Sequence, residues 1–144
     1  MAISFHSADA PVPVKDRRKL KSFIENIFAQ AQLPLKQVTY VFCSDGFLLN
    51  INQRFLQHDT YTDIITFPLS EKGEPVEAEI YISVDRVRDN AIHLKQPFKT
   101  EIHRVIFHGA LHLCGYKDKS KAAARLMRQM EDHHLELWRS TCFT

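Results

Sequence analysis

Two histidines four residues apart, His108 and His112, are followed by Gly115 and Asp118 in the segment HGALHLCGYKD. On a helix, residues i and i+4 lie one turn apart on the same face, so both imidazoles can be directed at one point. Gly115 can adopt the left-handed conformation that ends a helix, which would turn Asp118 back toward that point. Two imidazoles and one carboxylate bind zinc with a coordination position left open. The spacing therefore predicts a metal centre at the end of a helix.

The same residues have simpler interpretations. The chain contains eight histidines, so a pair at helical spacing also arises by chance on a helix face. Asp118 can be a solvated loop carboxylate, with the third ligand elsewhere. Two histidines and one carboxylate also accommodate iron, nickel or manganese. No further carboxylate or histidine near the segment is marked by its spacing as a general acid or base.

The spacing H-x3-H-x2-G-x2-D resembles the metzincin peptidase pattern H-E-x2-H-x2-G-x2-H. In those enzymes the glutamate after the first histidine is the general base. Gly109 occupies its place here, and glycine has no side chain to move a proton. A metallopeptidase is therefore an alternative against which this glycine argues.

Periodicity and turn residues predict the elements that must position these side chains. Helices are expected at 15–32, 47–56 (capped by Ser44 or Asp45), 84–95, from a Thr100 cap to Cys114, and from 121 to about 138. Strands are expected at 37–43, 61–70 and 77–85, the last two as a hairpin, with an extra strand at 3–7. The last helix is expected to bury Leu126, Met127, Met130, Leu137 and Trp138. This order predicts one α+β domain, 1–144, with several α-helices packed on a small mixed β-sheet and the metal site at the end of a central helix.

Composition and charge are those of an ordinary globular protein, with 44% hydrophobic and 25% charged residues. No apolar run is long enough to cross a membrane, and the N-terminal residues do not read as a signal peptide, so a cytoplasmic location is expected. Cys43, Cys114 and Cys142 form no CxxC pair and are expected to be free thiols. The net charge of +2 does not require a nucleic-acid partner, although the basic run at 15–21 is either a solvated helix face or a phosphate contact.

Three blocks of the sequence resemble the YbeY family of bacterial endoribonucleases. Residues 108–118 resemble its signature H-G-x-L-H-L-x-G-Y-D-H, with Lys117 in place of the aspartate and Asp118 in place of the third histidine. NQRFLQHDTYTDIITFP, 52–68, is similar to the block N-x-x-Y-R-G-x-D-x-P-T-D-V-L-S-F-P, and AEIYIS, 78–83, is similar to the strand G-D-I-x-I-S.

This resemblance implies a zinc-dependent endoribonuclease specific for single-stranded RNA. It implies action in rRNA maturation, notably at the 3′ end of the small-subunit RNA, and in ribosome quality control, with rRNA and ribosomal subunits as partners. The implied zinc ligands are His108, His112 and, by position rather than identity, Asp118. Because a carboxylate lowers the net positive charge at the metal, the ion is expected to be a weaker Lewis acid than with three imidazoles.

The second block supplies two weaker site candidates. Its register puts Leu56 where the family has a basic residue near its cleft, and Arg54 is expected on the surface because residues i and i+2 of a helix face different sides. Asp63 matches the aspartate of the T-D pair, and a structural role is preferred over orienting a ligand. Lys117 and Lys119 beside the site would hold RNA electrostatically.

A different class of function stays open. The protein can be a ribosome-associated assembly or binding factor in which a metal only pins the end of the helix. Such a protein would lose thermal stability without metal, would still bind RNA, and would cleave none.

Overall fold

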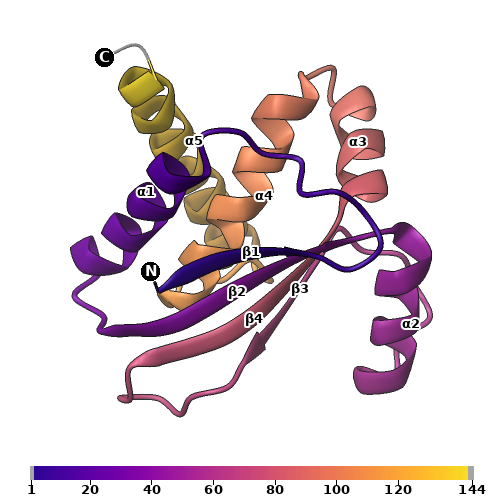
Figure 1. Ribbon diagram of the computed structural model, residues 1–144, viewed down its shortest axis with the longest axis horizontal. Coiled ribbons are helices and arrows are strands. Elements are labelled where there is room, and N and C mark those ends of the chain that lie inside the picture. Colours follow the sequence, from indigo (N-terminus) through magenta and orange to yellow (C-terminus); the bar gives the residue numbers. More distant parts are fainter. Residues whose placement is uncertain (1, 143–144) are drawn as a thin grey trace.

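A computed structural model of the protein describes residues 2–142, with helices gathered mainly on one side of a sheet (Figure 1). In chain order the elements are β1 (Ile3–Ser7), α1 (Arg17–Gln30), β2 (Leu35–Cys43), α2 (Asp45–Phe55), β3 (Ile64–Pro68), β4 (Val76–Ser83), α3 (Val84–His93), α4 (Phe98–Leu113) and α5 (Lys121–Cys142). The predicted order of helices and strands, including the extra strand at 3–7, is confirmed.

The sheet has the strand order β1-β2-β4-β3. Strands β1, β2 and β4 are parallel, and β3 pairs antiparallel with β4 at the edge, with Ile64 opposite Ile82 and Pro68 opposite Ala78. The sheet is therefore mixed and β3–β4 is a hairpin, as the sequence predicts. The far side of β3 carries no further strand among the described residues, which leaves room beside it for a cavity.

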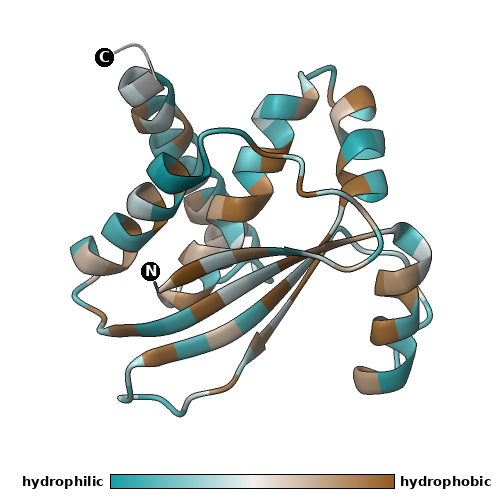
Figure 2. Ribbon diagram, viewed as in Figure 1, coloured by the Kyte–Doolittle hydropathy of each residue, from teal (hydrophilic) through white to brown (hydrophobic). Residues whose placement is uncertain are grey.

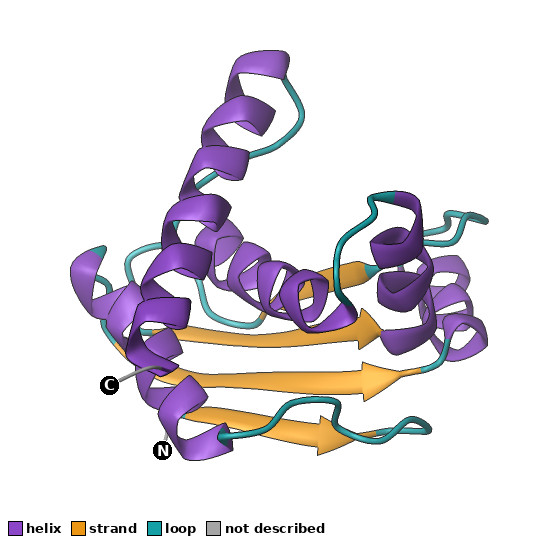
Figure 3. Cartoon of the chain, turned by 90° about the horizontal axis from the view of Figure 1, so that it is seen from above, coloured by secondary structure: helices purple, strands orange, loops and turns teal. Residues whose placement is uncertain are grey.

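The core lies between one face of the sheet and α1, α4 and α5, which cross above it (Figures 1 and 3). Hydrophobic and polar residues alternate along the strands (Figure 2), because successive side chains point to opposite faces. Val38, Tyr40 and Phe42 of β2 are fully buried on the helical side. The buried Tyr40 hydroxyl donates a hydrogen bond of 2.8 Å to the Ile106 carbonyl of α4, which ties this helix to the centre of the sheet.

The close approach of α4 to the sheet depends on Gly109. A Cβ atom at this position would lie 3.0 Å from Ile80 Cδ1 and 3.1 Å from Ile64 Cδ1. These distances are tighter than ordinary carbon contacts, so a Cβ atom here would force the ends of the Ile80 and Ile64 side chains to shift. The absence of a side chain at position 109 thus allows α4 to lie close to the sheet.

The predicted helix ends are only partly right. Ser44 caps α2, because its hydroxyl accepts from the Phe47 N–H at 3.2 Å. Thr100 as the cap of α4 is wrong: the helix already begins at Phe98, directly after Pro97, whose fixed backbone suits a helix start. Strand β3 begins at Ile64 rather than at residue 61, and β4 ends at Ser83, whose side chain caps α3 by accepting from the Arg86 N–H.

The predicted apolar face of α5 is also partly wrong. Met127 and Trp138 are buried, but Leu126 is 48% exposed and Leu137 is 37% exposed. The buried stripe contains Glu131, His134 and Leu135 instead. A prediction from apolar residues alone places the buried face of α5 at the wrong rotation about the helix axis, because two positions of this face, Glu131 and His134, are polar.

Two smaller expectations concern cysteines and membranes. Cys43 and Cys114 are free, as predicted, while the side chain of Cys142 lies outside the described residues. No helix within residues 2–142 combines the length and apolar character that crossing a bilayer demands.

Candidate active site

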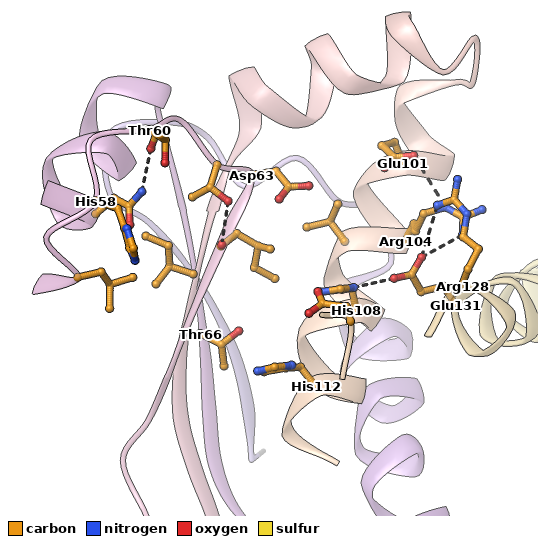
Figure 4. Close-up of a pocket in the computed structure, with 17 residues that line it drawn as sticks. His58, Thr60, Asp63, Thr66, Glu101, Arg104, His108, His112, Arg128 and Glu131 are labelled. Carbon is orange, nitrogen blue, oxygen red and sulfur yellow. Dashed lines mark hydrogen bonds and ion pairs between the residues drawn. The ribbon is translucent and has the colours of Figure 1, made fainter. Parts of the chain in front are cut away.

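A cavity of about 640 Å³ separates the edge strand β3 from α4 and α5. Figure 4 shows Asp63 and Thr66 on the sheet side, facing His108 and His112 across the opening. Asp118 also lines the cavity, so four of the predicted site residues share it.

His108 stands between two carboxylates. Its Nδ1 lies 2.6 Å from Glu131 Oε2, and its Nε2 lies 3.4 Å from Asp118 Oδ2. Burial by itself lowers the pKa of His108, but the hydrogen bond and charge of Glu131, with Asp118 and Asp63, outweigh burial and raise it. A neutral His108 that donates its Nδ1 proton to Glu131 presents the Nε2 lone pair to the cavity.

Glu131 is the centre of a buried charge network (Figure 4). Its side chain is only 8% exposed, and its Oε1 accepts from Arg104 Nη1 at 3.1 Å. Arg104 also contacts Asp132 at 2.8 Å and Glu101 at 3.9 Å. A buried carboxylate with both oxygens engaged is held in one position, so Glu131 fixes the orientation of the His108 ring.

His112 follows one turn after His108 on α4. The two rings are nearly parallel, with an interplanar angle of 5° and centroids 6.5 Å apart. The helix ends immediately afterwards: Gly115 has φ 104°, and the N–H groups of Gly115 and Tyr116 donate to the carbonyls of His112 and Leu111. This left-handed turn is the predicted one, and it directs the chain so that Asp118 returns to His108.

Asp63 and Arg54, the two weaker candidates, lie in different places. Asp63 precedes β3 on the cavity wall, and burial raises the pKa of its carboxyl, although His108 opposes that shift. Arg54 is exposed on α2, stacks its guanidinium over Phe55 at 5.8 Å, and does not line the cavity. Leu56 does line it, so the chain presents an apolar side chain on that wall.

The donor set suits zinc in kind, because one free imidazole nitrogen of His108, the His112 ring and the Asp118 carboxylate face the same space. The hydrogen bond from His108 Nδ1 to Glu131 is also the contact that typically orients a metal-binding histidine. As the side chains stand, no three histidine, cysteine or acidic residues within 2–142 converge closely enough to hold an ion. The three-ligand site therefore stays a prediction, which requires these side chains to move closer together.

The sequence interpretation missed Glu131, Arg104 and the cavity-lining His58. A signal for Glu131 was present, because it lies four residues after Met127 and four before Leu135, on the stripe that the helix buries. An acidic residue in such a stripe indicates a buried charge pair. Nothing in the local sequence marks Arg104 or His58.

Position 109 bears on the peptidase alternative. A Cβ atom at Gly109 would already lie 3.0 Å from Ile80 Cδ1 and 3.1 Å from Ile64 Cδ1. A glutamate at this position would therefore have to displace these side chains. The glycine and its close surroundings both argue against a general base at position 109.

Each comparison with known proteins matches most of the length of this chain. The profile of the family described as Endoribonuclease YbeY matches residues 3–139. An Endoribonuclease YbeY of Cytophaga hutchinsonii is 42% identical over 135 residues, which cover 94% of each chain. One of Flavobacterium psychrophilum is 42% identical over 87% of this chain and 89% of its own. The solution structure of TM1509 from Thermotoga maritima has a TM-score of 0.66 and 28% identity, and the match covers 96% of this chain and 93% of that one.

Proposed function

Because the chain belongs to the YbeY family of endoribonucleases, we propose that it is a zinc-dependent enzyme that hydrolyses phosphodiester bonds of single-stranded RNA. The family itself establishes a hydrolase that acts on RNA. Zinc, the preference for single strands and the cellular substrate are the parts of the proposal that go beyond membership.

The observation that carries the zinc proposal is the position of His108 between Glu131 and Asp118. His108 and His112 would hold the ion through imidazole nitrogens and Asp118 through a carboxylate oxygen. When bound there, zinc would supply Lewis acidity toward an oxygen of the phosphodiester. Iron, nickel and manganese are the other ions that this donor set accepts.

The residues of the chain have separable roles in this proposal. Glu131 orients His108 and keeps its Nδ1 proton in place, while Arg104 holds Glu131. Asp63 lies on the opposite wall, and burial raises the pKa of its carboxyl, which makes it a candidate for proton transfer.

We further propose rRNA as the substrate, with maturation of the small-subunit 3′ end and ribosome quality control as the processes, and the cytoplasm as the location. Family membership supports an RNA substrate. Ribosomal subunits are the partners that this role requires.

Elemental analysis of the purified protein, with parallel cleavage of a single-stranded RNA, tests the proposal. The wild type is expected to contain about one zinc per chain, and His112→Ala and Asp118→Ala are expected to lose both zinc and cleavage. Full zinc in Asp118→Ala would move the third ligand elsewhere. Zinc binding that raises the melting temperature without any RNA cleavage would instead favour the ribosome-associated factor in which the metal is structural.

A further inference from the structure

The active-site cavity carries an excess of negative charge. Its wall includes the carboxylates of Asp63, Glu101, Asp118 and Glu131. An RNA backbone is itself a chain of anions, and proteins that bind it neutralise its phosphates with lysine or arginine. If the proposed function is right, a cation other than the proposed zinc should therefore meet a neighbouring phosphate of the strand.

Two arginines, Arg104 and Arg128, line this cavity, and Arg104 is already paired with carboxylates of the protein. Its side chain is 13% exposed, and each of its guanidinium nitrogens faces a carboxylate: Nε faces Glu101, Nη1 faces Glu131, and Nη2 faces Asp132. An arginine whose nitrogens all face carboxylates of the protein has a structural role and is not free to bind a phosphate. The opposite wall presents Leu56, which offers no charge.

Arg128 of α5 differs from Arg104 in both exposure and partners. Its side chain is 52% exposed, and its Nη1 lies 3.6 Å from Glu131 Oε1. Within residues 2–142 its Nε and Nη2 have no hydrogen-bond partner. Two free N–H groups of a planar guanidinium match two oxygens of one phosphate.

Glu131 contacts both Arg128 and His108, so Arg128 lies near the proposed metal ligands. One oxygen of Glu131 pairs with His108 Nδ1, and the other faces Arg104 and Arg128 (Figure 4). The free Nε2 of His108 points away from Glu131, toward Asp118. Arg128 also borders a second hollow, which it shares with Thr100 and Arg139. Arg128 therefore lies between the two hollows, on the rim of the cavity and near His108 without contacting it.

We propose that Arg128 binds a backbone phosphate of the RNA next to the one that is cut. This inference rests on the proposed function and adds a substrate-binding residue to it. A contact with a neighbouring phosphate is made equally in the ground state and in the transition state, so its loss raises KM and leaves kcat unchanged.

The test compares Arg128→Ala and Arg128→Lys with Arg125→Ala, using a short single-stranded RNA. Arg125 is the matched control because it lies exposed on the same helix and carries the same charge, but lines neither hollow. Fluorescence anisotropy gives Kd at several salt concentrations, single-site cleavage gives kcat and KM, and elemental analysis gives zinc content.

For Arg128→Ala we expect Kd and KM to rise on the order of tenfold, which is the loss of one charge-assisted hydrogen-bond pair. The slope of log Kd against log salt should fall by about 0.7, the value for one phosphate of a single strand. Zinc content and kcat should not change, Arg128→Lys should recover part of the affinity, and Arg125→Ala should behave as the wild type.

Equal effects of Arg128→Ala and Arg125→Ala on Kd would overturn the inference and leave the proposed nuclease intact. A fall in kcat at unchanged KM would overturn it as well, because it would give Arg128 a role in the chemical step. A wild-type protein that neither binds nor cleaves RNA would instead remove the proposed function, and the inference with it.

Discussion

Replacing Glu131 by glutamine tests whether the acidic residue of α5 orients the histidine of α4. The substitution keeps the volume of the side chain and removes its charge. His108 Nδ1, at 2.6 Å, and Arg104 Nη1, at 3.1 Å, lose their anionic partner. An amide oxygen can still accept one of these hydrogen bonds, so the His108 ring would be held less firmly but would not lose its partner.

The magnitude follows from these contacts. Loss of an outer partner of a metal-binding histidine costs about 10- to 100-fold in metal affinity, so we expect roughly a tenfold weaker zinc affinity for Glu131→Gln. The free energy of unfolding should fall by about 1–2 kcal/mol, less than for an isolated buried ion pair. The reason is that Arg104 keeps Asp132 at 2.8 Å and Glu101 at 3.9 Å.

The assay is zinc competition with a chromophoric chelator at neutral pH, at a temperature where circular dichroism shows every variant folded. Glu136→Gln is the control, because Glu136 is an exposed carboxylate on the same helix without an ion pair in the described residues. It removes the same charge from α5 without touching His108.

A zinc affinity of Glu131→Gln equal to that of Glu136→Gln would refute the positioning role. If both affinities fell equally, long-range charge alone would explain the effect. A drop in melting temperature with unchanged zinc affinity would leave Glu131 as a purely structural residue.

Three further predictions concern packing, pH and the surface. Gly109→Ala should lower stability by about 1–2 kcal/mol, because its methyl group would press on Ile80, whereas Gly46→Ala, with no atom within 4 Å, should raise it by up to about 1 kcal/mol; urea midpoints in the reverse order would contradict this. Burial lowers the pKa of His134 below its unfolded value, so its contribution to stability is complete above about pH 6.5 and is lost as the pH falls through the folded pKa. His134→Gln should therefore flatten the decline of urea midpoints with acid, and parallel curves for variant and wild type would argue otherwise. Arg54→Ala should leave kcat/KM for RNA within about twofold, because this side chain lies outside the cavity; a larger loss would return it to the site.

The fold was accessible from sequence wherever a periodic pattern had one dominant cause. β-branched and aromatic residues marked β2, and the three-and-four spacing of apolar residues marked α1, because strand composition and one buried helix face are each local signals. The pattern failed on α5, where Glu131 and His134 face inward and Leu126 faces solvent. Burial of these polar residues is decided by partners on α4, which lie far away in the sequence.

The candidate site divides in the same way. His108, His112 and the Gly115 turn lie within one local segment, so helix geometry alone indicated that they face one space. The network of Arg104 and Glu131 joins residues 27 positions apart and depends on how two helices pack. The spacing of residues within a short segment cannot indicate such a pair.

The cavity is completed by the last helix of the chain, and this has a consequence for when the enzyme can act. Synthesis proceeds from the N-terminus, and the sheet together with α4 precedes α5 in the chain. A nascent chain that ends before Arg128 has both histidines of α4 but neither the exposed guanidinium of Arg128 nor the Glu131 carboxylate that contacts His108. The site of the hydrolase therefore stays incomplete during translation until α5 has been made and packs against α4.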